Sequence, residues 1–193
     1  MTDTSDILAE RFQIAESIES MNDYSERSDY VEALSGGNPT IADGCGRLWD
    51  VMHMSIADMR AVTGLSQEAF GNASMIPRRT IQNWETGTRC PGIARVHVAD
   101  CCNLLPIGGS RRSLEWRIDF AAATKNSNSA GEWLDWWRAP LAEIRAARLL
   151  TQSDLAKLLL CRKRAVQRWE SGDRHFPEYA RLYLLESFSM IDF

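Results

Sequence analysis

Hydrophobic and polar positions repeat along this chain with a constant offset, so that Gly46 aligns with Gly131 and no gap intervenes. The strongest stretch aligns residues 79–87 (RTIQNWETG) with residues 164–172 (RAVQRWESG). Self-similarity at a fixed spacing indicates a structural unit that is used more than once. The sequence therefore predicts two copies of one unit.

Each copy is predicted to begin with two short helices. The first helix starts near Ser55, which forms a capping-box pattern with Asp58, and near Pro140 in the second copy. Ser66 and Thr151 are placed to cap a second helix of about eight residues. These local signals set the expected helix starts in both copies.

Two further helices complete each predicted copy. The third extends from about 77 to 86 and from about 162 to 171, where a glycine follows that suits the left-handed end of a helix. The fourth is expected near 92–104 and 177–188.

The segments outside the copies are less regular. Residues 1–45 are polar and acidic and are predicted to be helical around 5–21. Residues 108–130 begin and end with small polar residues, as linkers do. Between Leu114 and Phe120, hydrophobic and charged residues alternate as in a strand, yet the same hydrophobic residues also pair at the four-residue spacing of a helix. From the sequence both structures remain open.

The net charge of −4 by itself disfavours a nucleic-acid partner, because nucleic-acid binders usually carry a basic excess. The charge is unevenly distributed, however. Of the 26 acidic and 22 basic side chains, 11 and 3 lie in residues 1–50, which leaves 15 and 19 for the rest of the chain. The repeated part is therefore mildly basic.

Several function classes find no support. No apolar run approaches the ~18 residues of a membrane span and the N-terminus is acidic, so we expect a cytoplasmic protein without membrane contact. Cys90, His97, Cys101 and Cys102 are the conceivable metal ligands, but adjacent cysteines point to different sides of a helix. We expect reduced thiols, no metal and no cofactor. Since no nucleophile with an adjacent base, phosphate loop or pair of catalytic carboxylates stands out, no enzymatic activity is predicted.

The third helix of each copy has one apolar and one polar face. Ile81 and Trp84, like Val166 and Trp169, lie three residues apart and are expected to face the core. The opposite face carries Arg78, Arg79, Gln82 and Asn83 in the first copy and Lys163, Arg164, Gln167 and Arg168 in the second. Arginine and lysine pair with guanine, and asparagine and glutamine with adenine, so this face is predicted to read bases in the major groove of DNA.

Each copy contains the motif Leu-Ser/Thr-Gln, followed by a helix, a turn and a second helix that ends in Trp-Glu-x-Gly, with an arginine upstream. In this motif each copy resembles the Cro and lambda-repressor type of helix-turn-helix family. The resemblance covers roughly 46–105 and 131–188. It implies an all-α fold of two tandem lambda-repressor-like helix-turn-helix domains with an acidic N-terminal extension. The expected divisions are the extension (1–45), the first domain (46–107), the linker (108–130) and the second domain (131–193).

The resemblance also implies roles for individual residues. The expected phosphate contacts are Gln67, Gln152, Thr86 and Ser171. The positions that match base-reading residues are Arg78, Arg79, Asn83, Lys163, Arg164 and Arg168. Two structural ion pairs are expected, Arg60 with Glu85 and Arg145 with Glu170.

Three positions depart from the family pattern. Met75 and Leu160 occupy the turn between the second and third helices, where the family usually has glycine. A non-glycine residue in a left-handed conformation costs about 1 kcal/mol, so a strained or altered turn is expected. Pro77 removes an N–H that would otherwise meet a phosphate. The first copy is therefore expected to bind DNA more weakly.

These observations lead us to expect a sequence-specific DNA-binding transcriptional regulator, a repressor, whose two copies act as the halves of a covalent pseudo-dimer on double-stranded DNA. A flexible linker of this length would span ~25–29 Å, near the ~34 Å between half-sites one helical turn apart. One alternative is a protein-interaction module, such as an antitoxin or a phage-encoded inhibitor of host defence. A homodimer or a protein partner would then bind through the acidic segment. In another alternative, one copy reads DNA and the other dimerises.

Overall fold

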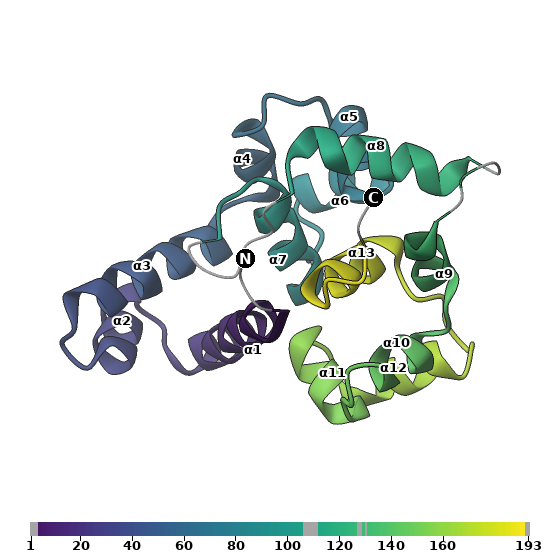
Figure 1. Cartoon of the computed structure of the whole chain (residues 1–193). Coiled ribbons are helices and arrows are strands. Elements are labelled where there is room, and N and C mark those ends of the chain that lie inside the picture. Colours follow the sequence, from purple (N-terminus) through teal and green to yellow (C-terminus); the bar gives the residue numbers. More distant parts are fainter. Residues whose placement is uncertain (1–3, 106–111, 127–128, 130, 192–193) are drawn as a thin grey trace.

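The computed structural model describes residues 4–105, 112–126, 129 and 131–191. Its secondary structure over these residues is helical, without a strand, which confirms the all-α prediction. The N-terminal part holds α1 (Thr4–Ser20), η1 (Met21–Asp23), α2 (Arg27–Ser35) and α3 (Pro39–His53). The first copy holds α4 (Ile56–Ala61), α5 (Gln67–Ser74), α6 (Arg78–Glu85) and α7 (Gly92–Cys101), followed by α8 (Leu114–Lys125) and α9 (Glu132–Arg138). The second copy holds α10 (Leu141–Ala146), α11 (Gln152–Leu158), α12 (Lys163–Glu170) and α13 (Glu178–Ser187) (Figure 1).

The predicted capping residues set the starts of the helices. The Ser55 hydroxyl accepts a hydrogen bond from the Asp58 backbone N–H at 3.0 Å, and Ser66 caps α5 in the same way. Thr151 and Asp154 form a complete capping box, in which each side chain accepts a bond from the other's backbone N–H. Since these bonds satisfy donors that have no partner inside the helix, both copies begin where their local sequence specifies.

The turn between the second and third helices is left-handed in both copies, although neither has glycine there. Met75 has a φ of 56° and Leu160 a φ of 47°. Only 7% of the Met75 surface is exposed, and Leu160 packs against the same hydrophobic core. Burial of these side chains offsets the backbone strain, which explains why the chain tolerates them at this turn.

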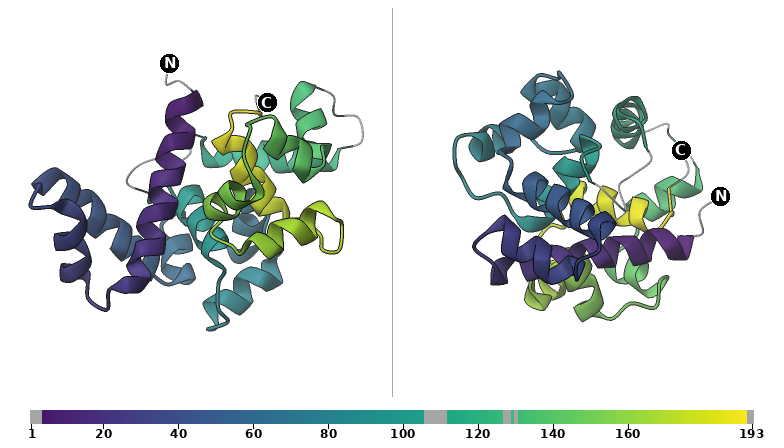
Figure 2. Two further views of the ribbon diagram at one scale, coloured as in Figure 1. Left: turned by 90° about the horizontal axis from the view of Figure 1, so that it is seen from below. Right: turned by 90° about the vertical axis from the view of Figure 1, so that its left-hand side faces the viewer.

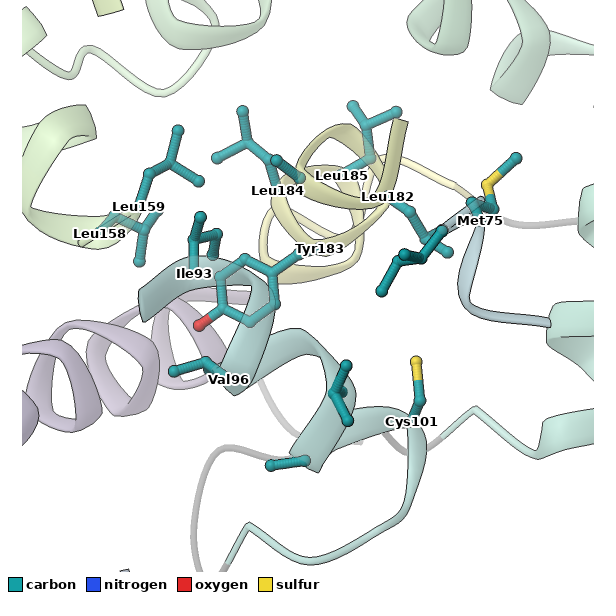
Figure 3. Packing of buried hydrophobic residues seen from close by; sticks show 14 of the residues in the cluster. Met75, Ile93, Val96, Cys101, Leu158, Leu159, Leu182, Tyr183, Leu184 and Leu185 are labelled. Atoms are coloured by element: carbon teal, nitrogen blue, oxygen red, sulfur yellow. The ribbon is translucent and has the colours of Figure 1, made fainter. Parts of the chain in front are cut away.

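The fourth helices of the two copies, α7 and α13, pack against each other in the middle of the molecule. Ile93 and Val96 on α7 and Leu182 and Leu184 on α13 are at most 4% exposed and belong to one core (Figure 3). The helices α4 to α6 lie at one end of this central pair and α10 to α12 at the opposite end (Figures 1 and 2). The two copies therefore share a core.

Equivalent positions of the two copies face each other across this central pair. Gly92, the first residue of α7, lies against Leu160 in the turn of the second copy. Glu178, the first residue of α13, lines the same hollow as Met75 in the turn of the first copy. Reciprocal use of equivalent positions is what an approximate two-fold relation between two units produces. The arrangement resembles a dimer made within one chain.

The structure corrects the expected linker. Within 108–130, residues 114–125 form α8, which packs along α5, while residues 108–111, 127, 128 and 130 lie outside the described residues. Arg117, Phe120 and Ala121 bury one helical face, each at most 2% exposed. The sequence pattern was ambiguous because Arg117 looked like a solvent-facing residue, whereas its charge is neutralised in the core. A flexible 23-residue tether is therefore wrong for the part that the structure describes.

The expected domain boundary between the extension (1–45) and the first domain (46–107) is also wrong, because α3 continues through it from Pro39 to His53. The acidic extension is part of the packed structure. Ile14 and Ala15 on α1 are buried, and α1 packs against α11 and α13 of the second copy. Since α3 also packs against α7 of the first copy, the extension contacts both copies.

Two buried arginines join these elements. Arg11 on α1 lies 3.2 Å from the Asp100 carboxylate on α7, and its guanidinium stacks 4.5 Å from the ring centroid of Tyr183. Arg117 on α8 lies 3.1 Å from Asp100 and 3.0 Å from Glu186 on α13. Each buried guanidinium thus has a carboxylate partner in the core, which offsets part of the cost of burying its charge.

Candidate nucleic-acid interface

The third helices, α6 and α12, each bury one side and expose the other. Ile81 and Val166 are fully buried. Trp84 is half-buried and meets Tyr179 of α13 edge-to-face at 6.3 Å, whereas Trp169 packs on Phe176 at 5.1 Å. These contacts fix how each helix is rotated about its axis, so that its polar face points away from the core.

The polar face of α6 forms one shallow hollow. Its lining residues are Arg78, Arg79, Gln82, Asn83 and Thr86. All five are exposed. The structure thus brings together the base-reading candidates of the first copy on a single accessible surface.

The polar face of α12 is more basic. Lys163, Arg164 and Gln167 are exposed and Arg168 is half-buried. A second hollow lies along this helix, lined by Arg162, Arg164, Ala165, Arg168, Trp169 and Arg174. Arg162 and Arg174, which flank the helix, are not among the residues predicted from the sequence. Their basic character beside α12 was the signal that could have identified them; α6 and α12 are called the recognition helices from here on.

The two expected ion pairs are present at the base of each recognition helix. Arg60 Nε lies 2.7 Å from Glu85 Oε1, and Arg145 Nε lies 2.7 Å from Glu170 Oε1. Each arginine also donates to the backbone carbonyl five residues further on, at 2.6 and 2.8 Å. Each pair thereby connects the first helix of a copy to the end of its third helix.

The glutamines that were expected at phosphates take part in these networks. Gln67 Nε2 donates to Glu85 Oε2 at 2.7 Å, and Gln152 Nε2 donates to Glu170 Oε2 at 2.8 Å. Partial burial raises the pKa of Glu85, but the hydrogen bonds from Arg60 and Gln67 outweigh burial and hold that pKa below its usual value. The glutamines therefore also hold the second and third helices together, a role that the sequence analysis missed.

The hydroxyls at the ends of the recognition helices donate to nearby carbonyls. Thr86 Oγ1 lies 2.9 Å from the Gln82 carbonyl oxygen and 3.1 Å from that of Asn83, and Ser171 Oγ lies 3.3 Å from that of Arg168. Each hydroxyl has one proton to donate. A hydrogen bond to a phosphate would therefore require the hydroxyl to rotate.

A further hollow of about 350 Å³ lies at the start of α6. Arg78 and Pro77 line it together with Ala121 and Lys125 from α8 and Glu178 from α13. Lys125 was not predicted from the sequence, because only the packing of α8 on α5 brings it to the recognition helix.

The cysteine and histidine residues that were considered as metal ligands are otherwise engaged. His97 Nε2 lies 2.9 Å from the Ser74 carbonyl oxygen and 3.5 Å from Cys101 Sγ. Burial lowers the pKa of His97 to about 3, and the nearby Arg117 charge acts in the same direction. No group of three potential ligands gathers around a metal position in the described residues. Within the same part of the chain, no helix combines the length and apolar character of a membrane span.

Comparison with known families agrees with this geometry. A helix-turn-helix family model matches the chain twice, at residues 56–97 and 141–187. These matches begin at the first residues of α4 and α10 and extend into or through the fourth helices. Searches of curated proteins and of solved structures gave no significant match. Residues 56–97 and 141–187 are therefore two helix-turn-helix domains in tandem.

Proposed function

We propose that this protein is a sequence-specific DNA-binding transcriptional regulator that represses its target, with α6 and α12 reading the two halves of one operator. The observation that carries the proposal is that both recognition helices expose a basic and amide-rich face while a shared core fixes their positions. Such side chains match the base edges of the major groove.

The shared core makes the pseudo-dimer rigid. α7 and α13 pack directly, and the buried Arg117 bonds to a carboxylate on each of them. A rigid pair loses little orientational freedom when its second half binds, because that freedom was lost during folding. The operator halves should therefore have one permitted spacing, rather than the range that a flexible tether would allow.

The proposed contacts divide into two classes. Those proposed to read bases are Arg78, Arg79, Gln82 and Asn83 on α6, and Lys163, Arg164, Gln167 and Arg168 on α12. Those proposed to contact phosphates are Gln67, Thr86, Gln152 and Ser171.

Fluorescence anisotropy of the full-length protein on its own upstream DNA and on a scrambled duplex tests DNA binding. The variants are Arg78→Ala/Arg79→Ala and Lys163→Ala/Arg164→Ala, and Arg47→Ala/Arg138→Ala, on α3 and α9, serves as the charge-matched control. We expect binding that weakens between ~50 and ~200 mM salt, is lost in both recognition-helix variants and persists in the control. No binding by any form would overturn the proposal and direct attention to a protein partner.

The rigid pseudo-dimer has a separate test. Five base pairs inserted between the operator halves turn one half by about half a helical turn relative to the other. We expect the affinity to fall to that of a single half-site. An insertion of ten base pairs should lower the affinity to the same value, because it places the second half beyond the reach of a rigid core. Unchanged affinity on both duplexes would contradict a rigid arrangement while leaving DNA binding intact.

A further inference from the structure

The recognition surfaces of the two copies differ systematically in charge. The insertion of one residue after Gly172 brings Arg174 into the place of Thr88, because their backbone N–H groups donate to equivalent carbonyls, of Arg168 at 3.0 Å and of Asn83 at 2.9 Å. Three arginines of the second copy then align with uncharged residues of the first: Arg162 with Pro77, Arg168 with Asn83 and Arg174 with Thr88.

These three arginines lie around a single hollow. Together with Arg164 they surround Ala165 and the half-buried Trp169, and the lining includes no acidic side chain. The hollow along α6 is formed by a partly different set of positions, and its two charged residues are Arg78 and Arg79. The three positions at which only the second copy has an arginine therefore lie within α12 and just beyond its two ends.

The three arginines lie at different positions relative to α12, which suits them to different contacts. Arg162 precedes the helix as its cap, and Arg174 follows Gly172 beyond its end. Residues at the two ends of a helix in the major groove are suited to the phosphates on either side of it. Arg168 lies within the helix, on the face of the proposed base-reading side chains.

We infer that the two copies read unequal half-sites, an inference that rests on the proposed function. The α12 half-site holds a guanine opposite Arg168 and is anchored by phosphate contacts of Arg162 and Arg174. The α6 half-site holds an adenine opposite Asn83 and lacks these two phosphate contacts. The operator is therefore an imperfect palindrome, with the second copy as its main electrostatic anchor.

Salt titrations of the full-length protein test the anchor. Each phosphate contact adds about 0.9 to the slope of log affinity against log salt. Arg162→Ala/Arg174→Ala should therefore lower the slope by about two, so that its loss of affinity between ~50 and ~200 mM salt is about tenfold smaller than in the wild type. The matched control Pro77→Ala/Thr88→Ala should leave the slope unchanged, and Pro77→Arg/Thr88→Arg should raise it by about two.

Base preference tests the unequal readout. Arg168→Asn should change the preferred base in the α12 half-site from guanine to adenine, and Asn83→Arg should make the reverse change in the α6 half-site, each by about tenfold. If the wild type binds its operator but these exchanges leave slope and base preference unchanged, unequal half-sites are wrong and the regulator proposal stands. If the wild type binds no DNA, both are wrong. Circular dichroism of each variant checks that the fold is intact.

Discussion

Asp100 on α7 and Glu186 on α13 occupy equivalent positions in the two copies, and the guanidinium of Arg117 lies 3.1 Å from the first and 3.0 Å from the second. Two buried carboxylates in this position would repel each other without cations between them. Arg11 and Arg117 supply those cations, and both come from helices outside the repeated units. The union of the two copies therefore depends on α1 and α8.

Replacement of Arg117 by methionine tests this dependence. Its guanidinium is fully buried, and its loss removes the cation that contacts both Glu186 and Asp100. We expect the free energy of unfolding to fall by about 3–5 kcal/mol, because a buried charge loses its partner. Urea denaturation followed by circular dichroism measures the change.

A surface ion pair provides the control for that prediction. Lys157 and Glu16 lie 3.2 Å apart, with side chains 48% and 60% exposed, and Lys157→Met should change the stability little, since water screens such pairs. Adding Glu186→Gln to Arg117→Met should restore part of the lost stability. Equal effects of Arg117→Met and Lys157→Met would show that the buried network contributes no more than a surface pair.

His97 should make stability depend on pH. Its pKa is lowered to about 3 in the folded protein, so the unfolded chain binds a proton near pH 6.5 while the folded chain stays neutral. Stability from this group is present above pH 6.5 and is lost as the pH falls toward 3, by at most about 1.4 kcal/mol per pH unit. His97→Gln should remove this dependence of stability on pH. Urea unfolding curves recorded between pH 4 and 8, at intervals of about one pH unit, measure it.

The difference in stability between the wild type and His97→Gln separates the contribution of His97 from those of its titratable neighbours. Burial raises the pKa of Glu186 to about 7, although Arg117 acts against it, so this group stabilises the folded state at low pH and that stability is lost as the pH rises through about 7. Asp100, Arg11, Arg117 and Glu186 are present in both proteins, so their shared contributions largely cancel in the difference. A constant difference between wild type and variant across this range would contradict a neutral buried His97.

Leu149 and Gly64 form a matched pair for backbone strain. They occupy equivalent positions with φ values of 55° and 68°, and Leu149 is 93% exposed, so it loses no packing when truncated. Leu149→Gly should raise the free energy of unfolding by about 0.5–1 kcal/mol, because glycine adopts the left-handed region without steric cost.

The reverse change at Gly64 should act in the opposite direction. A Cβ added there meets no atom within 4 Å, so Gly64→Ala introduces backbone strain without a clash. We expect a loss of about 1 kcal/mol, or roughly 2–4 °C in the melting temperature. Calorimetry of both variants measures the changes, and a lower melting temperature for Leu149→Gly would show that the left-handed turn carries no strain.

The sequence by itself determined the repeated helices and the orientation of their faces. Local signals such as Ser55, Ser66 and Thr151 set the helix starts, because caps act over three or four residues. The spacing of Ile81 and Trp84 identified the polar face of the recognition helix, because helical periodicity follows directly from the order of residues.

Only the tertiary structure decided how the copies are joined. The sequence predicted a flexible linker and a separate acidic extension, since Arg11 and Arg117 look like solvent-facing residues when their partners are unknown. Those partners, Asp100 and Glu186, lie 89 and 69 residues away along the chain. Neutralisation of a buried charge is a property of three-dimensional neighbours rather than of local sequence, and for this reason the sequence specified the two recognition helices while the fold fixed the rigid unit that holds them.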